Sequence, residues 1–194
     1  MSNDKLTFEI HGTKNFSEKE RQKFALAIKK AEFELNSEEF KTAVLLYPFE
    51  QTNGKSNQEI YDMIMSGADK FNTMEDQDID VQITLYYSWK KTIGYTYPST
   101  WATWVNRRFF SKFNESQIAG NVVHEYMHNM GFGHKKASDH NSVPYAIGYI
   151  IRDLIKKRKT GNTSLPEMPE APRPGKPVKL SLWGRFKRML KNIF

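Results

Sequence analysis

The feature that most constrains this chain is the stretch HEYMHNMGFGH at positions 124–134, which holds three of its five histidines. Residues four apart share one face of an α-helix, so His124 and His128 can direct ring nitrogens to one point. Glu125 adjoins the first of these histidines and can project beside that point as a base. The spacing therefore predicts a helix that carries a metal site on one face.

A reversal after this helix is expected to bring in a third ligand. Gly131 is predicted to end the helix, because glycine accepts the left-handed backbone that a sharp turn needs, and His134 then returns to the same metal. Three neutral imidazoles with one open position form the catalytic type of zinc site, so we expect Zn²⁺ on His124, His128 and His134. The alternative is a structural zinc site with His140 as fourth ligand, and the other interpretation of His140 is a solvated loop residue.

The longer pattern H-E-x-x-H-x-x-G-x-x-H, which runs from His124 to His134, resembles the signature of the metzincins. These are zinc endopeptidases of the astacin, adamalysin and matrix-metalloprotease type. The order of expected elements is also similar: a strand, a long helix, several strands, the active-site helix and a C-terminal helix. The resemblance implies a zincin-like fold and the activity of a zinc endopeptidase, with Glu125 as general base.

The segment after the third histidine departs from the family pattern. Metzincins carry a turn with a methionine below the metal, S-[IV]-M-x-Y, whereas this chain reads NSVPY: Ser142 and Val143 match, Pro144 replaces the methionine, and Tyr145 comes one residue early. We expect Pro144 to mark a compact turn beneath the metal in an atypical branch. A tyrosine after this turn reaches the metal or the oxyanion in some metzincins, which implies a catalytic role for Tyr145. Packing at a helix start is the other interpretation.

Hydrophobic periodicity predicts strands and helices in mixed order within a single compact unit. The resemblance implies an α+β fold for this unit, a single zincin-like domain over residues 1–160 with a mixed twisted sheet. On the most clearly patterned strand, alternate apolar residues from Ile79 to Tyr87 are expected on one side. The expected elements are a strand at 6–10, a helix capped by Ser17, an ambiguous helix or strand at 38–49, a helix capped by Ser56, a strand at 78–88, short strands at 92–98 and 102–110, a helix capped by Asn114, and a helix from about Val143 to near Gly161.

The expected reaction is hydrolysis of a peptide bond. Zinc lowers the pKa of its water and polarises the scissile carbonyl, and Glu125 moves the proton to the leaving amine. Zinc, helped by Tyr145, holds the oxyanion. A protein or peptide substrate would lie extended along an edge strand, for which 92–98 and 102–110 are both candidates. Two alternatives remain: an inactive zinc-binding protein at a membrane surface or on a partner, and a hydrolase of another substrate class.

Charge separates the end of the chain from the rest. Residues 1–150 hold 17 Lys/Arg against 19 Asp/Glu, a net of −2, whereas residues 151–194 hold 12 against 3, a net of +9. Residues 161–178 contain five prolines and are predicted to be a linker. Residues 179–194 are predicted to form a basic amphipathic helix for an anionic membrane surface, with docking on its own domain or on a partner as the alternative. Their apolar content suits lipid better than nucleic acid.

The sequence also gives expectations on compartment. No cysteine is present, which excludes disulfides and thiolate zinc sites. The first twelve residues, MSNDKLTFEIHG, contain no apolar run of signal-peptide length. We therefore expect cytoplasmic synthesis without a signal peptide. A peripheral position at a membrane and release from the cell both stay open.

Overall fold

The computed structural model describes residues 5–67, 77–96, 102–135 and 139–161. The chain divides into two units, Met1–Lys156 and Lys157–Phe194. The first holds the sheet and nearly all of the helices, and of the second only the stretch up to Gly161 is described. The predicted linker beyond Gly161 and the predicted helix at 179–194 lie outside the described residues.

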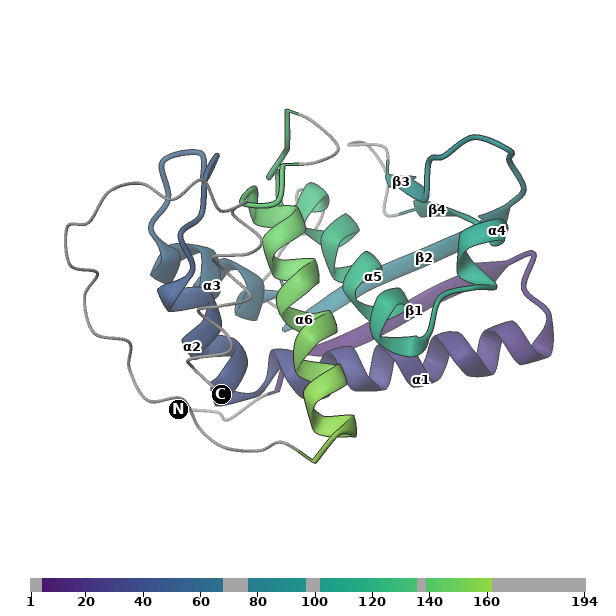
Figure 1. Ribbon diagram of the computed structural model, residues 1–194, viewed down its shortest axis with the longest axis horizontal. Coiled ribbons are helices and arrows are strands. Elements are labelled where there is room, and N and C mark those ends of the chain that lie inside the picture. Colours follow the sequence, from purple (N-terminus) through teal and green to yellow (C-terminus); the bar gives the residue numbers. More distant parts are fainter. Residues whose placement is uncertain (1–4, 68–76, 97–101, 136–138, 162–194) are drawn as a thin grey trace. The chain divides into compact units, whose positions relative to one another are not determined.

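The described part of the chain is α+β, with a four-stranded mixed sheet and six helices (Figure 1). In chain order the elements are β1 (Thr7–Lys14), α1 (Glu18–Leu35), α2 (Glu38–Leu46), α3 (Asn57–Ser66), β2 (Asp78–Tyr86), β3 (Gly94–Thr96), β4 (Ala102–Asn106), α4 (Arg107–Phe110), α5 (Glu115–Asn129) and α6 (Val143–Lys159). No helix among the described residues is long and apolar enough to cross a membrane.

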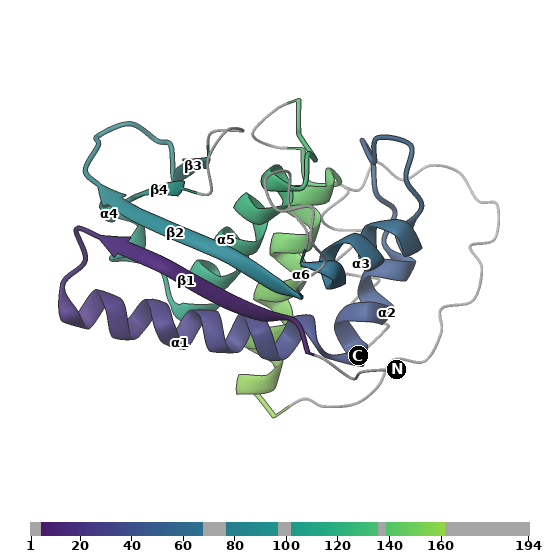
Figure 2. The same cartoon turned by 180° about the vertical axis from the view of Figure 1, so that it is seen from behind.

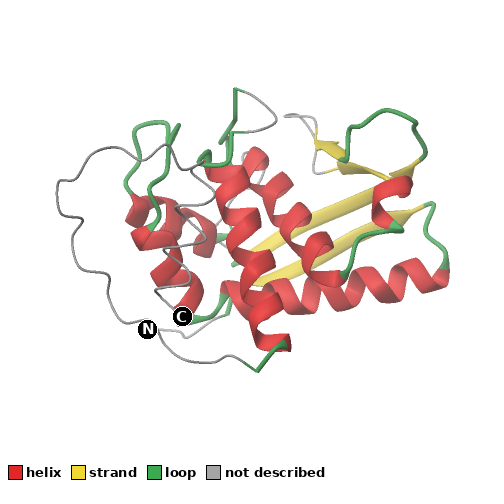
Figure 3. Ribbon diagram, viewed as in Figure 1, coloured by secondary structure: helices red, strands yellow, loops and turns green. Residues whose placement is uncertain are grey.

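The sheet has the order β1-β2-β4-β3, in which β1, β2 and β4 run parallel and β3 runs antiparallel to β4. The helices α1, α5 and α6 lie on one face of the sheet (Figure 3), and the opposite face of β1 and β2 is turned to the viewer in Figure 2. Alternate residues of β2 are buried, as a period of two requires when one face is covered. These residues are Ile79, Val81, Ile83 and Leu85.

The starts of the helices follow the predicted caps. Ser17 and Ser56 each accept a hydrogen bond from the backbone of the glutamate three residues later and complete a capping box with it, which confirms both predicted helix starts. Asn114 caps α5 in the same way, with Gln117 as its partner. The helix that carries the HEYMH sequence therefore begins at a defined residue.

Helices α5 and α6 cross at two glycines. A Cβ atom at Gly120 would lie 2.4 Å from the carbonyl oxygen of Gly148, and one at Gly148 would lie 2.6 Å from that of Gly120. Real Cβ atoms do not approach backbone so closely, so this crossing needs glycine on both sides. The close approach sets the start of α6 against the histidine-bearing half of α5.

The structure corrects several predicted boundaries. The first strand runs on to Lys14, and the ambiguous segment 38–49 forms helix α2, with Tyr47 extended just beyond it. The strand predicted at 102–110 ends at Asn106, whose side chain caps α4 by accepting a hydrogen bond from the backbone N–H of Arg108. Tyr87, predicted on the apolar side of β2, follows the end of the strand and is 59% exposed.

Candidate metal centre

Helix α5 presents its histidines on the side away from its core contacts. The half-buried positions of α5 beside the site recur at helical spacing, whereas the apolar positions between them are fully packed. The half-buried set is Gln117, Asn121, His124 and His128, and the packed set is Ile118, Ala119, Val122, Val123 and Met127. Burial of the apolar set therefore fixes the rotation of the helix and turns both histidines to one side.

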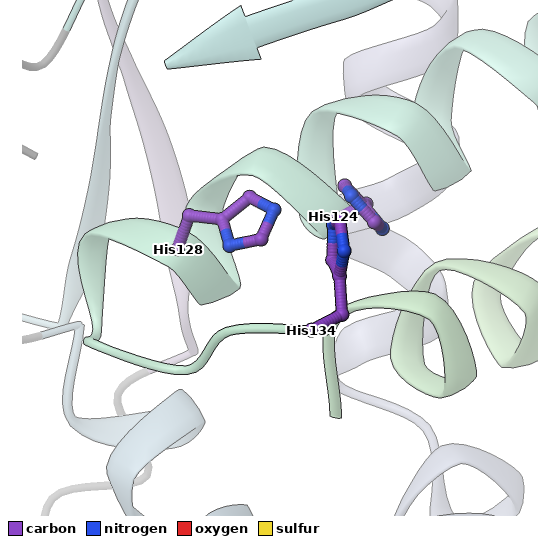
Figure 4. Close-up of side chains that lie close together, drawn as sticks. All are labelled: His124, His128 and His134. Carbon is purple, nitrogen blue, oxygen red and sulfur yellow. The ribbon is translucent and has the colours of Figure 1, made fainter. Parts of the chain in front are cut away.

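The turn after α5 brings in the third histidine as predicted. Gly131 has φ +95°, the left-handed conformation that ends the helix, and the buried Phe132 donates its backbone N–H to Met127 at 3.0 Å. One ring nitrogen from each of His124, His128 and His134 lies within 4.8 Å of the others. Figure 4 shows the three rings gathered between α5 and the segment that follows it.

The pKa values of His124 and His128 are lowered, which favours the neutral ring that can bind a metal ion. Burial and the two neighbouring imidazoles lower the pKa of His124 to about 3, against a smaller opposite effect of its hydrogen bond to the Pro144 carbonyl. Burial also lowers the pKa of His128, which the Phe132 carbonyl partly offsets. Neutral imidazoles offer lone pairs, and these are the form that binds zinc.

The hydrogen bonds around the rings fit a metal ion held by nitrogen. Nδ1 of His128 lies 2.8 Å from the Phe132 carbonyl oxygen, which leaves the other ring nitrogen to face the shared point. Nδ1 of His134 is buried and has no hydrogen-bond partner among the described residues. A buried polar atom without a partner is costly, and a ligand would remove that cost. The donor set, three nitrogens without a thiolate or carboxylate, suits zinc.

Glu125 lies beside the cluster and is only 5% exposed. Burial raises its pKa to about 7, although a hydrogen bond from the Thr96 hydroxyl to Oε2, at 3.0 Å, lowers it. The Thr96 hydroxyl also lies 2.8 Å from that of Thr103 on the neighbouring strand. A carboxylate with a pKa near neutrality can both take up and release a proton.

Tyr145 and His140 take different places around the cluster. The Tyr145 ring centroid lies 4.5 Å from that of His124 and 4.8 Å from that of His134, so this tyrosine faces the site. Nδ1 of His140 instead lies 3.1 Å from the Tyr149 hydroxyl, and His140 is not part of the nitrogen group. The group therefore contains three side chains among the described residues, which leaves room for a further ligand. Pro144 lies in the first turn of α6, so the turn predicted there comes earlier, at His140 and Asn141.

The loop between α2 and α3 supports the segments that hold the cluster. Its Asn53 side chain donates to the Gly131 carbonyl at 3.1 Å. The backbone N–H of Glu50 donates to the carbonyl of Asn141 at 2.9 Å, and the Asn141 amide donates back to the Glu50 side chain at 3.2 Å. Gln51 and Asp139 also contact each other through their side chains. This loop braces both the turn after α5 and the start of α6.

The cluster opens into a cleft of about 1040 Å³. Its walls are β3 with the preceding loop on one side and α6 on the other, and α5 forms its floor. Of the two candidate edge strands, β3 at 94–96 lies at the end of the described sheet, whereas β4 at 102–106 is paired on both sides. Of the two outer strands of the described sheet, β3 is therefore the one that borders the histidine cluster.

The sequence predicted the residues of the cluster but not the residues that hydrogen-bond to them or to the segments that hold them. His124, His128, His134 and Glu125 come together as predicted, and Tyr145 joins them. Thr96, Glu50 and Asn53 were not foreseen. These residues lie in short or irregular segments, and no local spacing links them to the motif.

Comparison of the chain with protein-family models, with curated proteins and with solved structures found no match.

Proposed function

We propose that this protein is a zinc-dependent endopeptidase with a zincin-like, metzincin-type catalytic domain. The observation that carries the proposal is the convergence of three imidazoles beside a buried carboxyl group, in a cleft bordered by an outer strand of the described sheet. A structural zinc site would need a fourth protein ligand, and the nitrogen group offers three side chains among the described residues.

The proposed roles follow from the positions of the side chains. His124, His128 and His134 would hold the zinc ion. Zinc there would supply a Lewis acid for the scissile carbonyl and would lower the pKa of a water molecule. Glu125 takes a proton from the attacking water and delivers it to the leaving amine, for which a pKa of about 7 is well suited. The Tyr145 hydroxyl donates a hydrogen bond to the developing oxyanion.

The substrate is proposed to bind as an added strand. An extended peptide that pairs with β3, an outer strand of the described sheet, gains backbone hydrogen bonds from Gly94–Thr96. Gly94 suits this position, because a Cβ atom there would lie 3.5 Å from Oε1 of Glu125 and 3.0 Å from the Trp104 carbonyl. The scissile bond would then lie over Glu125 and the histidines.

The test is cleavage of unfolded casein by zinc-loaded protein, followed with and without a chelator. Glu125→Gln should keep the zinc and the fold but lower the cleavage rate about 10²- to 10⁴-fold, because only the proton transfer is removed. Metal analysis of both proteins by mass spectrometry provides the control. If the zinc-loaded protein cleaves neither casein nor a broad peptide library, the alternative of a zinc-binding protein without peptidase activity replaces this proposal.

A further inference from the structure

The loop between β2 and β3 presents aromatic and basic side chains to solvent. It runs from Tyr87 to Ile93, and Figure 1 shows it arching away from the end of β2 beside α4. Trp89 is 78% exposed, Tyr87 is 59% exposed, and Lys90 and Lys91 are exposed as well. Tryptophan is highly buried on average, and apolar side chains exposed together among polar ones are typical of an interaction surface.

Hydrogen bonds from two residues that follow β3 hold this loop in shape. The fully buried Asn106 donates its side-chain amide to the carbonyl oxygens of Ser88 at 2.8 Å and Thr92 at 3.3 Å. The guanidinium of Arg108 donates to the carbonyl oxygen of Trp89 at 2.9 Å. The backbone of the loop is thus held at three points. A ligand that binds the exposed side chains therefore need not order the loop first.

A series of ring contacts joins this loop to the cleft. The guanidinium of Arg108 lies 5.6 Å from the centre of the Trp89 ring and 5.5 Å from that of the Phe109 ring. The Phe109 ring centroid lies 6.2 Å from that of Phe113, which lines the cleft. Lys91, at the other end of the loop, also lines the cleft. The exposed surface is therefore continuous with the wall of the cleft.

The charge of this region is positive only. The stretch 87–114 contains five Lys and Arg residues and no Asp or Glu, although residues 1–150 as a whole carry a net charge of −2. Of the five, Arg107 is paired with Glu20. Lys90, Lys91 and Arg108 form no ion pair with a carboxylate of the described residues. The complement of this surface is a negatively charged segment of the ligand.

We propose that this surface is an exosite, a contact area outside the cleft that binds an acidic stretch of the polypeptide substrate. The exosite consists of Tyr87, Trp89, Lys90, Lys91 and Arg108. A polypeptide fits it better than a lipid surface does, because a chain bound in the cleft passes directly onto a surface that is continuous with the cleft wall. The inference rests on the proposed peptidase function for the nature of its ligand.

The length of the loop limits where the acidic stretch lies in the substrate. A Cβ atom at Gly94 would lie 3.5 Å from Oε1 of Glu125, so Gly94 lies next to the proposed reacting centre. Trp89 precedes Gly94 by five residues, which span at most about 18 Å. An extended peptide covers that distance in about five residues. The acidic stretch therefore begins within about five residues of the scissile bond, on one side of it only.

The experiment uses two pairs of peptides that share one cleavable core. In each pair a flanking stretch of Asp and Glu is compared with the same stretch of Asn and Gln, placed before the core in one pair and after it in the other. For one pair only, zinc-loaded full-length protein should show a KM about tenfold lower for the acidic peptide, because several weak exposed ion pairs act together. The difference should shrink with added salt.

Lys90→Gln/Lys91→Gln should reduce this difference in KM to about twofold or less, because the two charges that face the acidic stretch are removed. Lys29→Gln/Lys159→Gln is the matched control. It removes two exposed charges from helices α1 and α6, and neither lysine lines the cleft. The control should keep the full difference. Equal KM values for the acidic and the neutral peptide in both pairs would overturn the exosite.

Binding of the same peptides by fluorescence anisotropy, in the zinc-loaded Glu125→Gln protein, separates the exosite from the peptidase function. Tighter binding of an acidic peptide that Lys90→Gln/Lys91→Gln removes supports the exosite even if the parent cleaves nothing. Cleavage without a preference leaves the peptidase in place and overturns the exosite. Weaker sedimentation of full-length Trp89→Ala with phosphatidylserine vesicles, together with no preference among the peptides, would assign the surface to lipid and also overturn it.

Discussion

At the scale of single residues, the three imidazoles have the same chemistry but different surroundings. His124 and His128 each make a hydrogen bond to a backbone carbonyl, whereas Nδ1 of His134 is buried without a partner among the described residues. His140 lies nearby and hydrogen-bonds to Tyr149. A histidine near the site can therefore share a metal only if one of its ring nitrogens lies with those of the other ligands, and the ring nitrogens of His140 do not.

We expect His134→Ala to lower zinc affinity by more than about 100-fold, because a proposed metal ligand is lost. Loss of a residue that only hydrogen-bonds to a metal ligand already costs about 10- to 100-fold. His140→Ala should change the affinity by no more than about tenfold. Competition with a chromophoric chelator measures both. Full zinc affinity in His134→Ala would show that this histidine is not a ligand, with His140 and Asp139 the next candidates.

Thr96 tunes Glu125. Its hydroxyl donates to the carboxylate, and a hydrogen bond to the charged form lowers the pKa. Thr96→Val therefore raises the pKa of Glu125. The proposed general base must be ionised to take up a proton, so activity is expected to fall as the pH drops through this pKa. The acid limb of the kcat/KM profile should therefore move to higher pH. Thr92→Val, in the loop before β3, should leave the profile in place. A shift to lower pH in Thr96→Val would contradict the role.

Tyr145 is expected to act in the transition state. Tyr145→Phe should lower kcat about tenfold or more with little change in KM, because only an oxyanion donor is removed and the ring that packs on His124 remains. Zinc content should be unchanged. Steady-state kinetics on one defined peptide measure the effect, and unaltered kinetics would assign Tyr145 to packing.

At the scale of elements, the sequence predicted the helix starts, because these depend on residues that are close together in the chain. Ser17 and Ser56 start helices because their capping partners lie three residues away. Strand ends depend on distant partners instead. The pairing of β2 with β4 ends at Tyr86 opposite Asn106, and Asn106 turns to cap α4, so Tyr87 is left outside the sheet. The alternating pattern through Tyr87 holds no information on where that partner strand stops.

The crossing of α5 and α6 predicts a large effect for one methyl group. Gly148→Ala places Cβ 2.6 Å from the Gly120 carbonyl oxygen and 3.2 Å from Cβ of His124. Alanine favours a helix by about 1 kcal/mol relative to glycine, but overpacking costs about 1–3 kcal/mol or more. We therefore expect a net loss of up to about 2 kcal/mol in unfolding free energy, and weaker zinc binding.

Gly12→Ala is the matched control for this crossing, because a Cβ atom there would meet only the Gln82 side chain, at 4.0 Å. Chemical denaturation of both variants with and without zinc measures the difference. Stability of Gly148→Ala equal to that of the parent would show that the two helices can separate without cost.

At the scale of the whole molecule, the sequence did not predict which strands and loops that are far apart in the chain lie next to each other. The motif at 124–134 predicted its own helix, its turn and the convergence of its three histidines. The identity of the edge strand was undecided, because it depends on β4 pairing with both β2 and β3. Glu50 and Asn53 brace segments about 80–90 residues further along the chain, and no periodic pattern relates positions so far apart. The supports of the site are thus a product of the tertiary fold.

The separation of charge along the chain gives the last prediction. Residues 1–150 carry a net charge of −2 and residues 151–194 one of +9, and the stretch 179–194 has no acidic residue. Near an anionic surface each Lys or Arg contributes roughly 1 kcal/mol, and salt screens this attraction. The full chain should therefore sediment with vesicles that contain phosphatidylserine, less so at high salt and less with neutral vesicles.

A chain that ends at Gly161 lacks only residues that the structure does not describe, and it keeps the cluster, the cleft and α6. It should stay in the supernatant with every vesicle and retain both its zinc and its turnover. Equal sedimentation of the two chains would rule out a membrane anchor at 179–194. A change in turnover on truncation would instead indicate that the basic segment docks on the domain that holds the histidine cluster, because removal of a separate anchor would leave the proposed site intact.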